Sequence, residues 1–126
     1  MQRLLNLMPD YKLVCEVRYE LDPHQLDEFA DYARTWMRLI RRHGGVHHGF
    51  FMPREAPSGV PMSFAGLGVT GPANEAVALF AFPDDDAYRR YRESVAADPE
   101  GVAANTRFAD PPFKSYRRCF LEPMSE

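Results

Sequence analysis

The alternation of apolar and polar side chains in Val14–Glu20 (VCEVRYE) constrains the fold of this chain more than any other feature. Every second residue from Cys15 to Tyr19 is apolar, whereas the residues between them, Glu16 and Arg18, are charged. Successive side chains of a β-strand point to opposite faces of the sheet. The stretch therefore predicts a strand with one apolar face, which a helix must cover, and one charged face, which is left for water, a partner subunit or a ligand.

Composition narrows the class of protein. The chain has 126 residues, of which 45% are hydrophobic and 26% charged, and this suffices for one core but not for two. The net charge of −3 disfavours nucleic-acid binding, because that affinity comes from clustered Lys and Arg. We expect a single domain over residues 12–122, with a flexible N-terminal arm at 1–11 and a tail at 123–126.

The sequence also predicts where in the cell the protein is found. No apolar run approaches the roughly 20 residues needed to span a bilayer. The break at Pro9–Asp10 leaves no signal-peptide core, so we expect a cytoplasmic protein.

Cys15 and Cys119 are too few for a disulfide scaffold and show no metal-ligand spacing. We expect both to be buried, reduced thiols on neighbouring strands.

A first helix is expected after this strand. Asp22 is placed to cap it, with Pro23 at the first helical position and Gln25 placed to complete a capping box. The helix ends at Gly44–Gly45, where glycine accommodates a positive φ. Apolar residues at steps of three and four predict one buried stripe, comprising Leu26, Phe29, Ala33, Trp36 and Ile40.

The rest of the chain supplies three more strands and a second helix. Strands are expected at about 46–52, 75–82 and 115–121, and the segment 53–72 is rich in Pro and Gly and predicts a long loop. Loops of this length are usually functional or mobile. Asp84 caps the second helix, which Pro99 breaks, and a short turn is expected near 102–104.

The order strand–helix–strand–strand–helix–strand predicts an α+β fold of the ferredoxin-like βαββαβ type. Right-handed crossovers place the first strand between the third and the last, with both helices on one face of the antiparallel sheet. The other face is left bare. Because exposed apolar patches usually mark an interface, we expect a homodimer whose sheets pack face to face as a dimeric α/β barrel.

Three stretches resemble the NIPSNAP family: CEVRYELDPHQLDEF, HHGFFMP and EAVALFAFPDDDAYRRYRESVAADPE, in this order along the chain. The resemblance implies the dimeric α/β-barrel fold. It implies little about activity, because most members of the family have no known biochemical function. The chain departs from the family pattern at Gly101, where an aromatic residue commonly follows Asp–Pro–Glu, and at Glu20, where Tyr is more frequent.

Glu16 and Arg18 are the sharpest candidates for a binding site. Side chains two apart on one strand lie about 7 Å from each other, within reach of an ion pair or a shared ligand. The alternative is a structural ion pair that ties two subunits together. We also expect Arg118 to pair with Glu16 across neighbouring strands.

The remaining candidates for ligand binding are mostly aromatic. His47 and His48 flank the start of the second strand and face opposite ways, so that one of them is a candidate base near neutral pH, and we include His48 among the ligand-binding candidates. Phe50 and Phe80 either line an apolar cavity or fill the sheet interface, whereas Trp36 is expected to pack in the core. Tyr116 and Arg118 share a face of the last strand.

These residues are compatible with three functions. The first is a dimeric protein that binds a small apolar or anionic molecule. The second is a cofactor-independent oxygenase or isomerase on a dimeric α/β barrel, by analogy of fold alone. The third is a structural or partner-binding dimer. No motif indicates a metal or a cofactor. In particular, the glycines at 66, 68 and 71 do not form a phosphate-binding loop, because they precede a strand and do not open a helix.

Overall fold

The computed structural model describes residues 10–64 and 66–124. The expected arm at 1–11 therefore lies almost wholly outside the described residues. The elements in chain order are β1 (Leu13–Glu20), a 3-10 turn (Pro23–Gln25), α2 (Leu26–Arg42), β2 (Val46–Phe51), β3 (Glu75–Phe82), α3 (Asp85–Ala97), α4 (Pro99–Arg107) and β4 (Ser115–Leu121).

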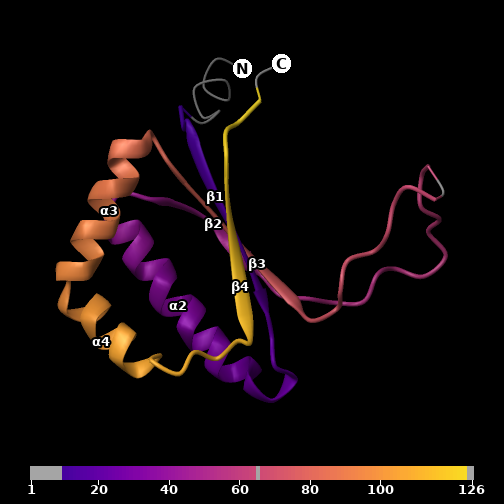
Figure 1. Ribbon diagram of the computed structural model, residues 1–126, viewed down its shortest axis with the longest axis horizontal. Helices are drawn as coiled ribbons and strands as arrows, with labels where there is room; N and C mark the ends of the chain where they lie inside the picture. The colour runs from indigo at the N-terminus through magenta and orange to yellow at the C-terminus, as the bar shows by residue number, and fades with distance from the viewer. Residues whose placement is uncertain (1–9, 65, 125–126) are drawn as a thin grey trace.

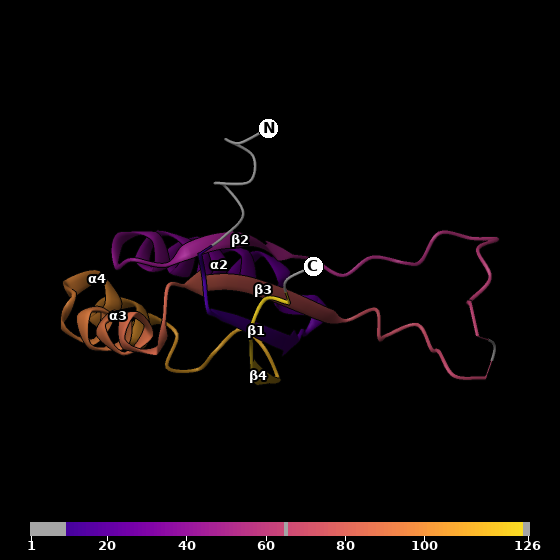
Figure 2. The same ribbon diagram turned by 90° about the horizontal axis from the view of Figure 1, so that it is seen from above.

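The four strands form one antiparallel sheet in the order β2–β3–β1–β4. β1 therefore lies between the third and last strands, as the crossover rule predicts. All three helices cover the same face of this sheet (Figures 1 and 2). The α+β, ferredoxin-like prediction is confirmed for the single chain.

The strand register assigns side chains to the two faces. Cys15 is opposite Phe80 on one side and Phe120 on the other, so all three point toward the helices. Glu16 is opposite Leu79 and Cys119, which point away from the helices. We call this second side the open face; it carries Val14, Glu16, Arg18, Glu20, Phe51, Glu75, Val77, Leu79, Arg117, Cys119 and Leu121.

The start of α2 differs from the prediction. Asp22 caps a 3-10 turn, its carboxylate accepting the His24 N–H at 2.9 Å, and the α-helix begins only at Leu26. Gln25 does not close a capping box; its amide donates to Glu28. Leu26, predicted to be buried, is the first residue of α2 and is 42% exposed. The prediction for these two residues was wrong.

The second helical region is longer than predicted. Asp84 caps α3 by accepting the Ala87 N–H at 2.8 Å, as expected. Pro99 does break the helix, but Asp98 caps a new one, and the expected short turn is the nine-residue α4. α4 packs against α2 and α3.

Aromatic side chains fill the space between the sheet and the helices. Tyr19 of β1 lies edge-on to Phe29 of α2, with ring centroids 5.1 Å apart, and to Phe113 at 4.9 Å. Phe82 of β3 packs in the same way on Tyr88 of α3 at 5.3 Å. Edge-to-face pairs add stability beyond the area they bury, so this core fixes the position of the helices on the sheet.

The two cysteines lie on opposite faces. Cys15 is buried, and burial raises the pKa of its thiol to about 11. Cys119 is exposed on the open face, so the prediction of two buried thiols was wrong for it. The cause is the register, which pairs Cys119 with Glu16 and not with Cys15.

The edge strand β4 is exposed along its whole length. No helix among the described residues is long and apolar enough to cross a bilayer.

The segment between β2 and β3 forms an arm, residues 52–64 and 66–74, which we call the β2–β3 arm. It projects from the side of the sheet opposite the helices (Figure 1). No described residue of this arm lies in a helix or strand, so the prediction of a long loop is confirmed.

Candidate functional site

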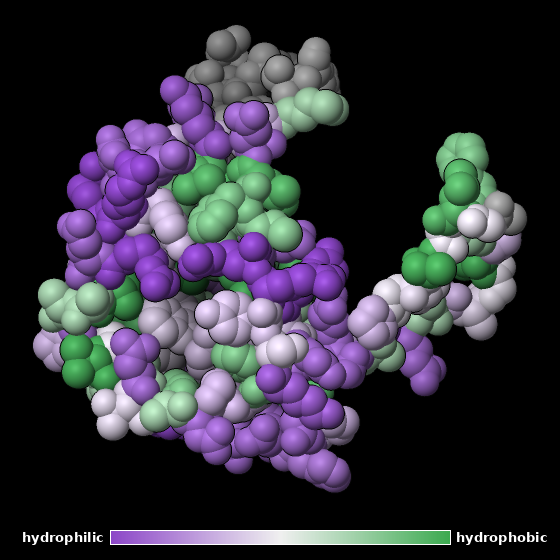
Figure 3. Space-filling view, viewed as in Figure 1, coloured by the Kyte–Doolittle hydropathy of each residue, from purple (hydrophilic) through white to green (hydrophobic). Residues whose placement is uncertain are grey.

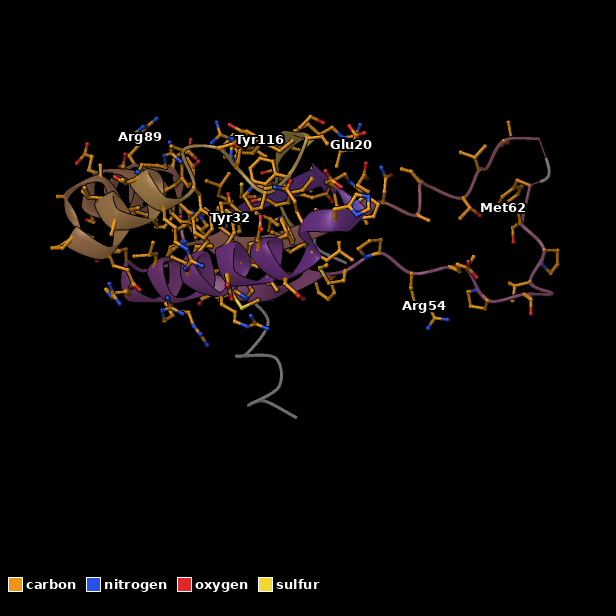
Figure 4. The ribbon with its side chains drawn as sticks, turned by 90° about the horizontal axis from the view of Figure 1, so that it is seen from below. Glu20, Tyr32, Arg54, Met62, Arg89 and Tyr116 are labelled. Carbon is orange, nitrogen blue, oxygen red and sulfur yellow. The ribbon has the colours of Figure 1, made fainter. Side chains whose placement is uncertain are left out.

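A cavity of about 230 Å³ lies between the sheet and the helices. β1, β2, β3 and β4 supply its floor, and α2 and α3 supply its walls. Tyr32 of α2 and Tyr116 of β4 approach it from opposite layers (Figure 4). We call it the aromatic cavity; it is lined by Val17, Tyr19, Tyr32, Trp36, Ile40, Phe50, Phe80, Tyr88, Tyr91, Arg92, Tyr116 and Arg118.

Two guanidinium groups line this cavity, and none of the described residues that line it is acidic. Arg118 donates to the Tyr88 hydroxyl at 3.1 Å and lies over the Phe120 ring at 5.0 Å. Arg92 comes from α3. The cavity thus combines apolar walls with positive charge, which suits an anion with an apolar body.

Four tyrosines of the cavity, Tyr19, Tyr32, Tyr88 and Tyr91, are neutral at physiological pH. Burial raises the pKa of Tyr32, Tyr88 and Tyr91 above the ordinary value. Burial, with Tyr32 close by, raises the pKa of Tyr19 further, and the Tyr19 and Tyr32 hydroxyls lie 3.5 Å apart. These four hydroxyls therefore act as hydrogen-bonding groups and not as bases at pH 7.

His47 lies behind one wall of the cavity. Its ring stacks on Phe50, with centroids 5.5 Å apart and planes at 16°. Burial, together with Arg41, lowers the pKa of His47 below its usual range, and its Nε2 is buried without a hydrogen-bond partner among the described residues. His47 is neutral at pH 7 but does not line the cavity.

The open face carries a separate charged network. Arg18 donates to Glu16 at 2.7 Å and to Glu75 at 2.9 Å, and Arg117 lies 3.7 Å from Glu75. A second hollow of about 310 Å³ adjoins this network, lined by Arg18, Glu20, Pro72, Asn74, Glu75, Ser115, Tyr116 and Arg117. Glu20, which is labelled in Figure 4, marks the position of this hollow at the base of the β2–β3 arm.

The structure separates the candidates from the sequence into two groups. Phe50, Phe80, Tyr116 and Arg118 line the aromatic cavity. Glu16 and Arg18 lie on the opposite side of the sheet. His48 is exposed and lies 6.0 Å from the Tyr11 ring.

The expected ion pair between Arg118 and Glu16 is absent from the part of the chain described. The two residues lie on adjacent strands but one register position apart, so they point to opposite faces: Arg118 is opposite Val17, and Glu16 is opposite Cys119. This prediction was wrong.

Several cavity residues escaped the sequence analysis as site residues. Trp36, assigned there to the core, is only half-buried and lines the cavity, as does Tyr32 one helical turn before it. Tyr91 and Arg92 come from α3. The available signal was the i, i+4 spacing of aromatic residues at positions 32 and 36, which places both on one helix face.

Within the described ranges no group of three or more His, Cys, Asp or Glu side chains is placed to hold a metal ion.

An antiparallel sheet with three helices on one face defines this chain as a ferredoxin-like α+β protein. The family model of NIPSNAP matches residues 15–125, and the chain belongs to the NIPSNAP family. The predicted resemblance is thereby confirmed. No curated protein matches the chain.

Solved structures share this fold. An uncharacterized NIPSNAP-like domain protein from Burkholderia xenovorans is 24% identical, with a TM-score of 0.66 over 93% of this chain and 89% of that one. A NIPSNAP family protein of unknown function from Agrobacterium tumefaciens is 17% identical, with a TM-score of 0.65 over 90% of this chain and 89% of the other. SnoaB, a cofactor-independent oxygenase from Streptomyces nogalater, is 17% identical, with a TM-score of 0.58 over 91% of this chain and 95% of its own.

Proposed function

We propose that this NIPSNAP-family protein is a dimer that binds a small, largely apolar anion in the aromatic cavity. One observation carries the proposal: an aromatic-walled cavity whose lining includes the exposed side chains of Arg92 and Arg118 and, among the described residues, no acidic side chain. Pockets for small molecules are mostly apolar, with a few polar groups that fix orientation. A planar carboxylate or enolate matches a guanidinium in charge and geometry.

The volume limits the size of the ligand. A cavity of about 230 Å³ lies just below the range of drug-sized pockets, roughly 300–1,000 Å³. It suits a single-ring aromatic acid better than a polycyclic compound. The ring stacks against the tyrosine and phenylalanine walls, and the carboxylate faces the two arginines.

An oxygenase of the cofactor-independent kind is the second candidate, supported by the fold shared with SnoaB. Such chemistry needs a group that accepts a proton from the substrate near neutral pH. The four tyrosines with raised pKa values are poor bases there. The cavity therefore supports binding better than acid–base catalysis, and an activity with a pH–rate profile breaking near neutrality would favour the enzyme instead.

The dimer follows from the open face and from β4. β4 is an edge strand exposed on both sides, and its free edge presents unpaired backbone groups. Packing two open faces together covers Phe51, Val77 and Leu121 and encloses the charged network of Arg18. A purely structural dimer is the remaining alternative, and ligand binding distinguishes the two.

A ligand panel tests the proposed function. Thermal unfolding is measured with benzoate, phenylacetate and salicylate, and with benzamide and benzylamine as neutral and cationic controls. A ligand at 100 times its dissociation constant adds about 2.7 kcal/mol to stability, so the acids are expected to raise the Tm by several degrees. Absence of a shift with every acid would contradict the proposal.

Substitution of the arginines locates the site. Arg118→Gln and Arg92→Gln are each expected to weaken acid binding by about tenfold or more, because a charge-assisted contact is lost. Arg89→Gln is the matched control: Arg89 also belongs to α3 but points outward and pairs with Asp86 at 2.7 Å (Figure 4). An equal loss of affinity in all three variants would place the ligand elsewhere.

A further inference from the structure

We propose that the β2–β3 arm is an exchange arm, which packs its apolar tip on a second copy of the same chain. The proposal rests on the dimer proposed above and adds a second contact to it. The arm leaves the sheet at Phe51, extends away from the body on the side of the open face, and returns at Glu75 (Figures 1 and 2).

The arm is rich in apolar side chains, and those named below are exposed within the part of the chain that the structure describes. Phe64 is 81% exposed, Leu67 86% and Val69 88%, and Val60 and Met62 are also exposed. Figure 3 shows the arm standing clear of the body, with open space between them. Contiguous apolar side chains of this kind mark an interaction site.

The charges of the open face favour a second copy as the occupant of this space. Glu16, Arg18, Glu75 and Arg117 form a network of two carboxylates and two guanidiniums, so the face has little net charge at its centre. Across a twofold axis the guanidiniums of one copy can lie opposite the carboxylates of the other, so such a network can be self-complementary. The arm itself has only one residue of each sign, Arg54 and Glu55. A nucleic acid or an acidic lipid surface would instead select a cationic face.

The length of the arm fits this role. Each limb has about 11 residues and reaches up to about 36 Å when extended. Stacked sheets lie about 10 Å apart. The arm continues from the ends of β2 and β3 on the side away from the helices (Figures 1 and 2), and it is therefore long enough to pass a partner's sheet and reach its flank. The exposed Phe64, Leu67 and Val69 are then buried against the partner.

The first experiment removes the apolar tip. The triple variant Phe64→Ser, Leu67→Ser, Val69→Ser is compared with the unmodified chain by sedimentation and light scattering over a dilution series. The dissociation constant of the dimer is expected to rise by at least about tenfold, because buried aromatic and aliphatic anchors dominate interface energies. Val102→Ser is the control, since Val102 is an exposed apolar residue on α4, on the helical side.

The second experiment does not depend on dimer strength. The photo-crosslinker p-benzoylphenylalanine is placed at position 64 or, as a control, at position 102. Illumination is expected to give a covalent dimer on a denaturing gel only for position 64. Binding of the arm to vesicles of phosphatidylcholine is measured in parallel.

The outcomes separate this proposal from the proposed function. A dimer with unchanged dissociation constant in the triple variant and no interchain cross-link at position 64 overturns the arm exchange while leaving the sheet-to-sheet dimer standing. Vesicle binding that requires Phe64, without interchain cross-linking, overturns it in favour of a lipid surface. A monomeric unmodified chain refutes both the dimer and the arm exchange, and leaves the ligand panel to decide on the aromatic cavity.

Discussion

Tight packing explains why Gly101 departs from the family pattern. Gly101 stands in α4, where the NIPSNAP resemblance leads one to expect an aromatic side chain. A Cβ at this position would clash with the backbone carbonyl oxygen of Val95. The backbone oxygen cannot turn away as a flexible side chain can, so glycine here allows α4 to fold closely back on α3.

Gly101→Ala is therefore expected to destabilise the protein. Overpacking against a backbone atom typically costs about 1–3 kcal/mol. Urea unfolding checks this through the midpoint at constant slope. Gly71→Ala is the control, because a Cβ there meets nothing within 4 Å. An unchanged midpoint for Gly101→Ala would show that α4 shifts without cost.

At the scale of the elements, Asp98 joins α2 to the helices that follow β3. Its carboxylate accepts the Glu100 N–H at 2.8 Å, which caps α4. It also accepts from Arg42 at 2.9 Å and from His43 at 2.7 Å at the end of α2. Hydrogen bonds from Arg42, the largest cause, and from His43 hold the pKa of Asp98 well below its usual range.

The pH dependence of Asp98→Asn follows from this lowered pKa. Asn keeps an oxygen for the cap but loses the ion pairs, so the Tm is expected to fall at pH 5. A carboxylate with a lowered folded pKa contributes stability above its ordinary value near 3.8, and loses it as pH falls through the folded value. The difference in Tm between the two proteins is therefore expected to shrink below about pH 3.8.

Calorimetry of both proteins from pH 5 to pH 2 measures this difference. Glu100, whose pKa is also lowered by Arg38 and Arg42, is present in both proteins, so its own titration largely cancels in this difference. Asp110→Asn, at an exposed carboxylate before β4, is the control. A difference in Tm that is independent of pH would assign the effect of Asp98 to the cap alone.

At the scale of the whole molecule, the sheet separates two regions with different proposed roles. The aromatic cavity lies under the helices, and the network of Arg18, Glu16 and Glu75 lies on the open face. In the single chain the Arg18 side chain is still 38% exposed, so its ion pairs are partly screened by water. In a face-to-face dimer they would be enclosed, and their loss would then cost more.

Arg18→Met tests this division. Light scattering of the unmodified chain at micromolar concentration is expected to show twice the chain mass of 14.4 kDa. The variant is expected to raise the dissociation constant of the dimer by about tenfold, because two carboxylates lose their partner at the interface. Its affinity for an aromatic acid is expected to be unchanged. Arg34→Met, at an exposed pair on α2, is the control.

Loss of acid binding in the dimeric Arg18 variant would return Glu16 and Arg18 to the ligand site that the sequence first predicted. The second hollow on the open face, which Arg18 lines, would then be the binding site.

The sequence by itself determined the four strands, the two longer helices, their order and the two faces of β1, but not the helix α4. Periodicity is a local property, so the alternation from Cys15 to Tyr19, the caps at Asp22 and Asp84 and the helix break at Pro99 could be interpreted one segment at a time. The strand order then followed from the handedness of crossovers. The predicted burial of Leu26 was wrong because burial depends on where the helix axis lies over the sheet. The apolar stripe of the helix does not by itself give that position.

Only the tertiary structure decided which candidates lie together. The register of β4 against β1 places Arg118 beside Val17 and turns Cys119 to the open face, and a shift of one residue would exchange these sides. No local pattern in β4 specifies that register, since all seven of its residues are exposed. The aromatic cavity likewise depends on residues from six elements, and their distances are set by the packing of helices on the sheet.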